Sequence, residues 1–159
     1  MSLLPRGLRP GACVGMFTPS WPAPAHWNDD RAAQFLREQG FRVKYGALYG
    51  KRDGYRSGDI CERAAEFNAL LHDDEVDCLM TASGGYVSNS MLPHLDYAYL
   101  QANPKVIMGL SDVTALLLGI FAKTGLVTFY GPCLDQSQRT AQIPLADRAP
   151  GRACAGQAH

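Results

Sequence analysis

A single serine, Ser111, stands where a buried strand is predicted to end and a helix to begin. It lies in the run KVIMGLSDVTALLLGI, residues 105–120, which passes from a β-rich segment through a glycine and the serine to an apolar segment of helical character. A hydroxyl on a sharp strand-to-helix turn is the geometry of a nucleophile elbow, with backbone N–H groups beside it. Serine is also a common helix N-cap, so Ser111 could simply satisfy the first turn.

A serine nucleophile needs donors for an oxyanion and a base for its proton. The donors are available, because the N–H of Asp112 lies at a helix start and the Gly84-Gly85 turn has no Cβ to keep a second N–H away. No base is evident, and GLSDV lacks the second glycine of the G-x-S-x-G elbow. Asp112 can also be read as a first-turn acid stabilised by the helix dipole.

Other candidate groups have simpler structural explanations. The segment SGGYVSN, residues 83–89, resembles a phosphate-binding loop only loosely, because it has neither the G-x-G-x-x-G spacing nor the Lys-Ser/Thr pair of a Walker A loop. Its glycines can equally form a plain turn. We expect His94 to lie at the surface or in packing, Tyr97 and Tyr99 to pack, and Tyr55 to be exposed.

Strands and helices alternate along the chain. Strand patterns cover residues 12–18, 41–45, 76–82, 105–110 and 126–130, and helical spacing covers residues 28–39, 59–71, 88–92 and 112–123. This order predicts an α/β fold with a mostly parallel sheet and helices on both faces. Ligands bind such sheets at the carboxyl ends of the strands, where both Ser111 and the Gly84-Gly85 turn fall.

Composition narrows the classes of function. The 159 residues suffice for one domain, and 15 basic against 15 acidic side chains give no net charge for a nucleic-acid partner. The longest apolar run, residues 115–122, is far shorter than the ~20 residues of a membrane span. Residues 1–10 lack the apolar region of a secretory signal. We therefore expect a cytoplasmic protein without a membrane or nucleic-acid partner.

The metal-binding residue types are dispersed. The five cysteines form no CxxC pair, which is typical of free thiols in a reducing compartment, and the four histidines form no HExxH motif. We expect no metal site. These residues are Cys13, Cys61, Cys78, Cys133, Cys154, His26, His72, His94 and His159.

Several separated motifs agree with one family. SGGYVSNSMLPHLDY, PKVIMGLSDVTALLLGI and KTGLVTFYGP follow one another in this order, and the opening half contains GACVGMFTPSWP, DGYRSGD and RAAEFNALLHDDEVDCLMTASGG. Together they closely resemble the LD-carboxypeptidase family of serine peptidases and, within it, the microcin C immunity branch. The resemblance covers residues 4–134, which we expect to be the family's amino-terminal domain.

The resemblance implies an amide hydrolase without metal or cofactor that cuts next to a carboxy-terminal residue. Its substrate would be a small peptide, a murein tetrapeptide ending in D-alanine, or a peptidyl nucleotide in which an aspartate is joined to an acylated nucleotide. Carried over by position, Ser111 is the nucleophile, and the N–H groups of Asp112 and Gly85 form the oxyanion hole. The residues expected to bind substrate are Gly84, Tyr86, Ser88 and Asn89.

The end of the chain departs from the family pattern. In the family, the histidine base and the glutamate that orients it come from a carboxy-terminal domain about as large as this chain. Residues 135–159 contain no glutamate, and their one histidine is His159. We expect that domain to be missing and this segment to be an irregular tail, either disordered or out of register with the family.

Two readings of function follow. In the first, the chain is the nucleophile-bearing domain of a serine carboxypeptidase, with little turnover alone because loss of a triad base leaves only ~10³-fold catalysis or somewhat more. In the second, it binds small carboxylate ligands or a partner chain without hydrolysing them. A nucleotide-binding module built on the Gly84-Gly85 turn is a weaker third reading. Apolar surface normally covered by the missing domain would favour self-association, so we also allow for a homodimer.

Overall fold

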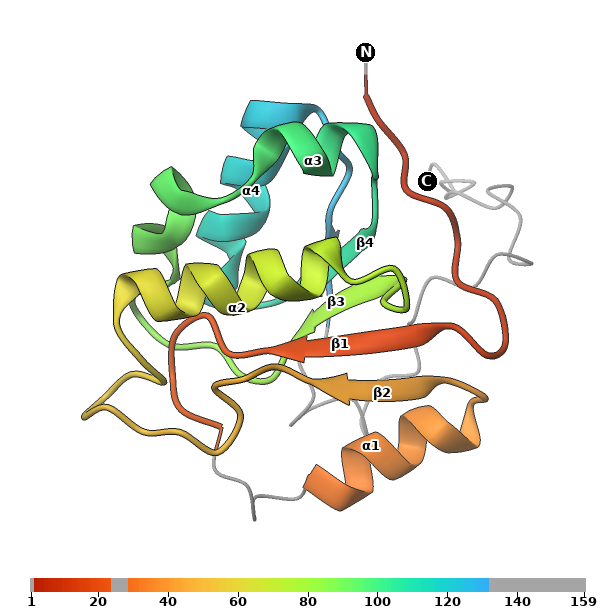
Figure 1. The fold of residues 1–159 in the computed structure, drawn as a ribbon, viewed down its shortest axis with the longest axis horizontal. Helices are drawn as coiled ribbons and strands as arrows, with labels where there is room; N and C mark the ends of the chain where they lie inside the picture. Colours follow the sequence, from red (N-terminus) through yellow and green to blue (C-terminus); the bar gives the residue numbers. More distant parts are fainter. Residues whose placement is uncertain (1, 24–28, 132–159) are drawn as a thin grey trace, which may run out of the picture.

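The structure is a computed structural model that describes residues 2–23 and 29–131. Within these residues, five strands form one sheet in the order β2-β1-β3-β4-β5, and every neighbouring pair is parallel (Figure 1). The strands are β1 (Cys13–Phe17), β2 (Arg42–Tyr45), β3 (Cys78–Thr81), β4 (Val106–Gly109) and β5 (Phe129–Tyr130). The predicted α/β class with a parallel sheet is confirmed. The tail at residues 135–159 lies outside the described residues.

The three central strands are buried on both faces, which explains their unbroken apolar runs. Alternate residues of each strand enter two separate cores, as the two-residue period of a strand requires. The side chains of one core include Phe17, Leu79 and Ile107, and those of the other include Val14, Met80 and Met108.

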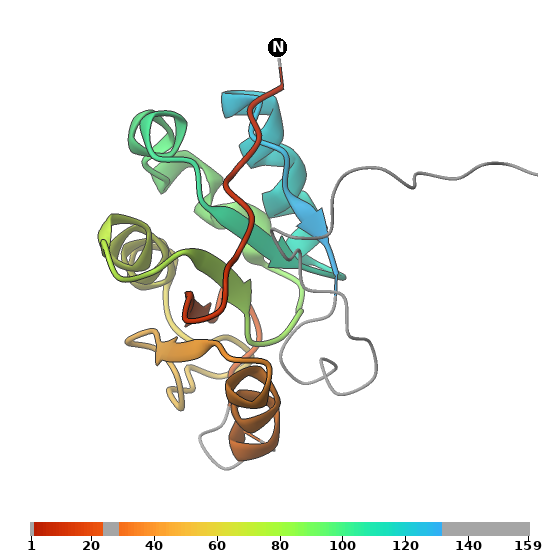
Figure 2. The same cartoon turned by 90° about the vertical axis from the view of Figure 1, so that its right-hand side faces the viewer.

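Helices cover both faces of the sheet (Figures 1 and 2). Buried residues of α2 (Ile60–His72), α3 (Tyr97–Ala102), α4 (Val113–Thr124) and the 3₁₀ helix η1 (Ser88–His94) form the first core with the strands. On the opposite face, α1 (Asp29–Glu38) contributes Leu36 to the second core. In the part of the chain that the structure describes, no helix is both long and apolar enough to cross a membrane.

The order of the strands places a topological switch point between β1 and β3. From β1 the chain moves outward to β2, and then returns to the other side of β1 to build β3, β4 and β5. The connections therefore diverge at the carboxyl ends of β1 and β3, and ligands of open α/β sheets bind at such a switch point. The residues that follow these two strands are 18–21 and 82–86.

Two predicted elements differ from the structure, and one observed helix was not predicted. The helix predicted to end near Pro93 is a 3₁₀ helix that contains this proline. The last strand is shorter than residues 126–130, because Leu126 instead forms an isolated bridge with Leu3. The predictions also missed α3, a six-residue helix capped by Asp96, whose carboxylate accepts from the N–H of Tyr99. So short a helix has no measurable period in the sequence.

Candidate active site

Ser111 adopts a backbone conformation that a side chain rarely tolerates. Its φ is 60°, and it is the one non-glycine residue with positive φ among residues 2–23 and 29–131. A non-glycine residue in this left-handed conformation costs about 1–3 kcal/mol, and residues strained in this way cluster at active sites, ligand clamps and switch regions. The side chain is exposed at the end of β4. This is the geometry predicted for a nucleophile elbow.

The competing N-cap prediction for Ser111 is wrong. The N-cap position of α4 is occupied by Asp112, and the helix has no side-chain capping hydrogen bond. Ser111 contributes only its carbonyl to the first turn, which accepts from the N–H of Thr114 at 3.0 Å. Its hydroxyl is therefore not used to close the helix.

Gly84 lies directly beside the serine. A Cβ at position 84 would stand 3.1 Å from the Cβ of Ser111 and 3.3 Å from its Oγ. These distances are tighter than ordinary van der Waals contact, so a side chain here would crowd the hydroxyl. The turn after β3 and the turn after β4 are thus brought together at one edge of the sheet, as the sequence predicted.

The backbone N–H groups that follow Gly84 differ in whether they have a hydrogen-bond acceptor. Those of Tyr86 and Val87 donate to the Oγ of Ser20 at 2.8 and 3.0 Å, and that of Ser88 donates to the carboxylate of Asp112 at 2.9 Å. The N–H of Gly85 has no acceptor among the described residues. Gly85 has a φ of 152°, and a Cβ there would meet the backbone nitrogen of Trp21 at 2.7 Å. Only glycine fits this position.

The carboxylate of Asp112 is used to hold the neighbouring turn, because it accepts a hydrogen bond from the N–H of Ser88. Besides accepting from the N–H of Ser88, Asp112 accepts from the hydroxyl of Ser88 at its own carbonyl oxygen, at 2.8 Å. These two bonds join the start of η1 to the start of α4. The N–H of Asp112 has no acceptor among the described residues, so it is available beside Ser111.

The remaining predicted substrate-binding residues divide by burial. Ser88 is fully buried and its hydroxyl is used by Asp112, so its side chain has no surface to offer a ligand. Asn89 is exposed, and Tyr86 is 78% exposed. The ring of Tyr86 makes an edge contact with Trp21, with 6.1 Å between ring centroids. Two aromatic rings therefore stand on the same edge as Ser111.

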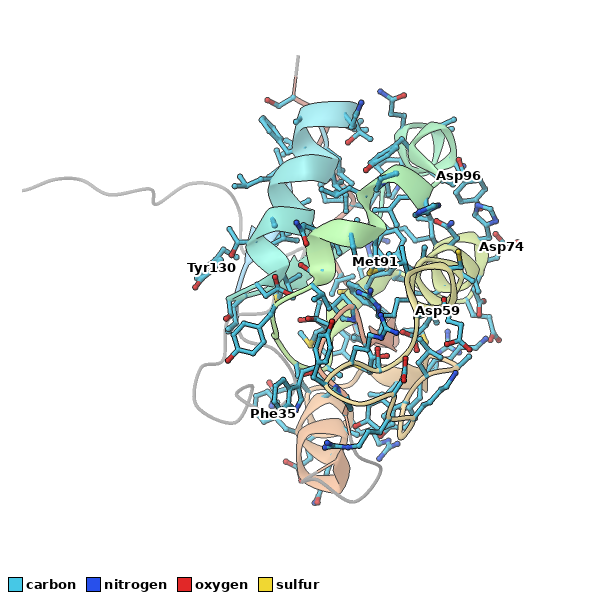
Figure 3. The ribbon with its side chains drawn as sticks, turned by 90° about the vertical axis from the view of Figure 1, so that its left-hand side faces the viewer. Phe35, Asp59, Asp74, Met91, Asp96 and Tyr130 are labelled. Atoms are coloured by element: carbon cyan, nitrogen blue, oxygen red, sulfur yellow. The ribbon has the colours of Figure 1, made fainter. Side chains whose placement is uncertain are left out.

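Figure 3 faces this edge of the sheet. Asp59 at the start of α2 and Met91 in η1 lie over its central part, whereas Tyr130 of β5 lies at the rim. Two residues that support this edge, Ser20 and Arg63, were not predicted from the sequence. The available signal for Arg63 was a charged residue within the buried stretch of an amphipathic helix.

No candidate base contacts Ser111 in the described part of the chain. His72 bonds through Nε2 to Asp96 at 3.0 Å, and His94 is exposed, with its carbonyl accepting from Asn68. Neither imidazole forms a hydrogen bond with the serine hydroxyl. Within residues 2–23 and 29–131, no group of three or more His, Cys, Asp or Glu side chains could hold a metal ion.

A separate pocket of about 810 Å³ opens at the opposite edge of the sheet. Its lining includes Arg9, Asp77 and Lys105, which precede β1, β3 and β4 respectively. Because these residues lie at the amino ends of the strands, the pocket does not belong to the edge that carries Ser111.

Comparison with known proteins assigns the family. Residues 14–131 match the family described as the LD-carboxypeptidase N-terminal domain. The chain belongs to the LD-carboxypeptidase family. This confirms the resemblance inferred from the motifs.

Members of the LD-carboxypeptidase family match most of this chain. The microcin C7 self-immunity protein MccF of Escherichia coli is 51% identical over 137 residues, which are 85% of this chain and 40% of MccF. The probable murein peptide carboxypeptidase of Bacillus subtilis is 37% identical over 131 residues, which are 82% of this chain and 41% of that protein. The chain thus spans about two-fifths of the length of these relatives.

Solved structures of family members share the fold. The wild-type apo structure of MccF superposes with a TM-score of 0.82 at 50% identity, covering 85% of this chain and 41% of MccF. Other MccF structures are complexes with aspartyl sulfamoyl adenosine and with glutamyl sulfamoyl guanosine. A further one is an active-site mutant in which a serine, an asparagine and a lysine are replaced by alanine.

Proposed function

We propose that this chain carries the nucleophile and the oxyanion hole of a serine carboxypeptidase that hydrolyses an amide bond. The observation that carries the proposal is the left-handed backbone of Ser111, which presents an exposed hydroxyl at the carboxyl edge of the sheet. The N–H groups of Gly85 and Asp112, which have no acceptor among residues 2–23 and 29–131, support it, and so does the presence of a serine in the active site of MccF.

The proposed step begins with attack by the Oγ of Ser111 on the carbonyl carbon of the substrate. A bond forms between these two atoms, and the electron pair of the C=O bond moves onto the oxygen. The N–H groups of Gly85 and Asp112 donate to this oxyanion, the kind of contact worth 10²–10³-fold in rate in other serine hydrolases. The serine proton passes to a base and then to the nitrogen of the leaving group, while the oxyanion re-forms the C=O bond, the C–N bond breaks and the acyl-enzyme forms. Water then attacks the ester carbonyl of the acyl-enzyme, the bond between Oγ and the acyl carbon breaks, and the serine hydroxyl is restored with a proton from that water.

The base of this reaction is proposed to come from outside the described residues, because no described histidine contacts Ser111. We therefore expect little turnover from the isolated chain. The isolated chain would then bind small carboxylate ligands without hydrolysing them, as the second hypothesis states. The MccF complexes point to an aminoacyl nucleotide as one class of ligand, and the Bacillus subtilis relative points to a murein peptide as another.

Substrate contacts are proposed at the exposed residues of the same edge. Tyr86 and Asn89 follow Gly85 in the chain, and Trp21 contacts Tyr86. Gly84 contributes by leaving room beside the hydroxyl of Ser111. Ser88 is assigned to support of the turn, since it is buried.

Hydrolysis by the purified 159-residue chain tests the proposal. The assay uses a murein tetrapeptide and a processed microcin analogue, with Ser111→Ala beside Ser2→Ala, a change at an exposed serine near the amino terminus. We expect any turnover to disappear in Ser111→Ala and to persist in Ser2→Ala. Turnover that survives in Ser111→Ala would refute the nucleophile.

Ligand binding tests both interpretations when turnover is absent. Aspartyl sulfamoyl adenosine, the ligand of one MccF structure, is titrated into the folded chain and followed by calorimetry. Binding without hydrolysis is expected if the base lies elsewhere. A folded chain that neither binds this compound nor hydrolyses either substrate would contradict both readings.

A further inference from the structure

A buried arginine joins the loops that surround the candidate site. Arg63 of α2 is only 1% exposed, and its guanidinium makes five hydrogen bonds. Nε donates to the carbonyls of Gly58 and Asp59 at 3.0 and 3.2 Å. Nη1 donates to the carbonyls of Pro19 and Val87 at 2.6 and 3.1 Å.

The fifth bond completes the link to the turn after β3. Nη2 of Arg63 donates to the hydroxyl of Ser90 at 3.0 Å, and this hydroxyl in turn donates to the carbonyl of Val87 at 2.6 Å. One planar group thus holds the segment after β1, the segment before α2 and the segment after β3. Lysine could not replace it, because an ammonium lacks the fixed fork of donors.

The same turn is held from its other side by Ser20. The Oγ of Ser20, which is buried, accepts from the N–H groups of Tyr86 and Val87, and the N–H of Trp21 donates to the carbonyl of Gly84 at 3.1 Å. Arg63 binds the carbonyl of Pro19, which immediately precedes Ser20. The guanidinium therefore holds both the acceptor, Ser20, and the turn that donates to it.

Arg63 also places a buried positive charge behind the site without a direct ion-pair partner among the described residues. In the described part of the chain it forms no ion pair, and its partners are carbonyls and one hydroxyl. Burial lowers the pKa of its guanidinium, yet an arginine stays protonated at any physiological pH. Such a buried cation is costly to the fold, which calls for a reason beyond stability.

We infer that Arg63 is a positioning residue that aims the N–H of Gly85 at the oxyanion formed on the substrate. The inference rests on the proposed function, because the direction of this N–H matters only if it stabilises that oxyanion. Arg63 does not touch the reacting atoms; it acts through Pro19, Val87 and Ser90. A displacement of about 1 Å in such a group can cost about 10²-fold in rate.

The test compares Arg63→Lys with Arg56→Lys in the full chain. The control makes the same chemical change at a guanidinium that is about one-third exposed and contacts Asp53 and the ring of Tyr55, both in its own loop. Amide resonances and hydrogen exchange of ¹⁵N-labelled protein are measured by NMR, with urea unfolding as the measure of global stability. In Arg63→Lys we expect the Gly85 amide resonance to shift. We also expect hydrogen exchange at the amides of Tyr86 and Val87 to be about tenfold faster than in the wild type, after correction for any change in the exchange of the sheet amides, which reports global stability.

This readout does not depend on turnover, so it separates the inference from the proposed function. Unchanged amides at residues 85–87 in a folded Arg63→Lys variant would overturn the inference, whatever the activity of Ser111. If Arg63→Lys does not fold, Ser90→Ala decides, since it removes one partner of the guanidinium and little volume. A Gly85 shift in Ser90→Ala supports the inference, and an unchanged Gly85 resonance overturns it.

Where Ser111-dependent turnover is measured, a second signature applies. Arg63→Lys is expected to lower kcat at least about tenfold and to leave KM nearly unchanged, because an oxyanion forms only in the transition state. A rise in KM with constant kcat would instead assign Arg63 to ground-state binding and overturn the inference.

Discussion

Ser111 combines a chemical and a conformational signal in one residue. A serine after a β-rich run was compatible with a cap or a nucleophile, and the φ of 60° favours the nucleophile because a capping residue has no need of left-handed backbone. The two glycines allow close packing around this residue. Gly84 lies against Ser111, and Gly85 lies against Ser20 and Trp21.

Backbone strain at Ser111 predicts a measurable difference in stability between two variants at this position. Replacing it with glycine relieves the left-handed conformation, whereas alanine retains it, so Ser111→Gly is expected to be about 1 kcal/mol more stable than Ser111→Ala. Both variants lose the proposed nucleophile. Urea unfolding of the two proteins measures the difference, and equal midpoints and slopes would show that position 111 is not strained.

At the scale of elements, α2 does most to organise the candidate site. Its start is set by a capping box, in which the carboxylate of Asp59 accepts from the N–H of Glu62 at 2.8 Å and the carboxylate of Glu62 accepts from the N–H of Asp59 at 3.1 Å. The helix then buries Arg63 and Glu66, whose side chains both bind the segment that follows β1, at Pro19 and Thr18 respectively. A well-defined start therefore sets where both buried charges lie.

Loss of this cap should destabilise the protein modestly. Asp59→Ala removes one capping acceptor and is expected to cost about 1 kcal/mol of unfolding free energy. Asp53→Ala, which removes only an exposed ion pair with Arg56, should cost less than about 0.5 kcal/mol. Chemical denaturation of both variants checks the ranking, and a cost for Asp59→Ala no larger than that of Asp53→Ala would argue against the cap.

At the scale of the whole molecule, a buried carboxylate ties the sheet to its covering helix. Glu66 is 3% exposed and accepts from the N–H and the hydroxyl of Thr18, both at 2.8 Å, and from the N–H of Leu48 at 2.8 Å. Burial raises its pKa above the usual range, and the bonds from Thr18 and Leu48 oppose this effect without cancelling it. The folded state therefore holds the proton of Glu66 more tightly than the unfolded chain does.

The raised pKa of Glu66 fixes the sign of a pH effect. A carboxyl group whose pKa is higher in the folded state favours folding at low pH, and this contribution is lost as the pH rises from the ordinary glutamate pKa through the raised one. We expect wild type to lose stability relative to Glu66→Gln as the pH rises from about 4 upward. Urea unfolding of both proteins across this range measures the difference, and parallel pH profiles would contradict it.

Most of the fold followed from local patterns. Apolar runs placed β1, β3 and β4 within one or two residues of their observed ends, and the spacing of apolar residues placed α2. Such patterns record which faces of an element are buried, and this is sufficient for the α/β class. They were insufficient for α3 and β5, whose formation depends on contacts with distant segments.

The sequence by itself determined the family, the class of fold and the serine that marks the candidate site, because each depends on residue types at short spacing. Only the tertiary structure decided which N–H groups at that site remain free and which side chains hold them. The bond from Arg63 to Pro19 spans 44 positions, and that from Tyr86 to Ser20 spans 66. Partners so far apart meet because the strand order brings the ends of β1 and β3 together, which no local pattern in the sequence specifies.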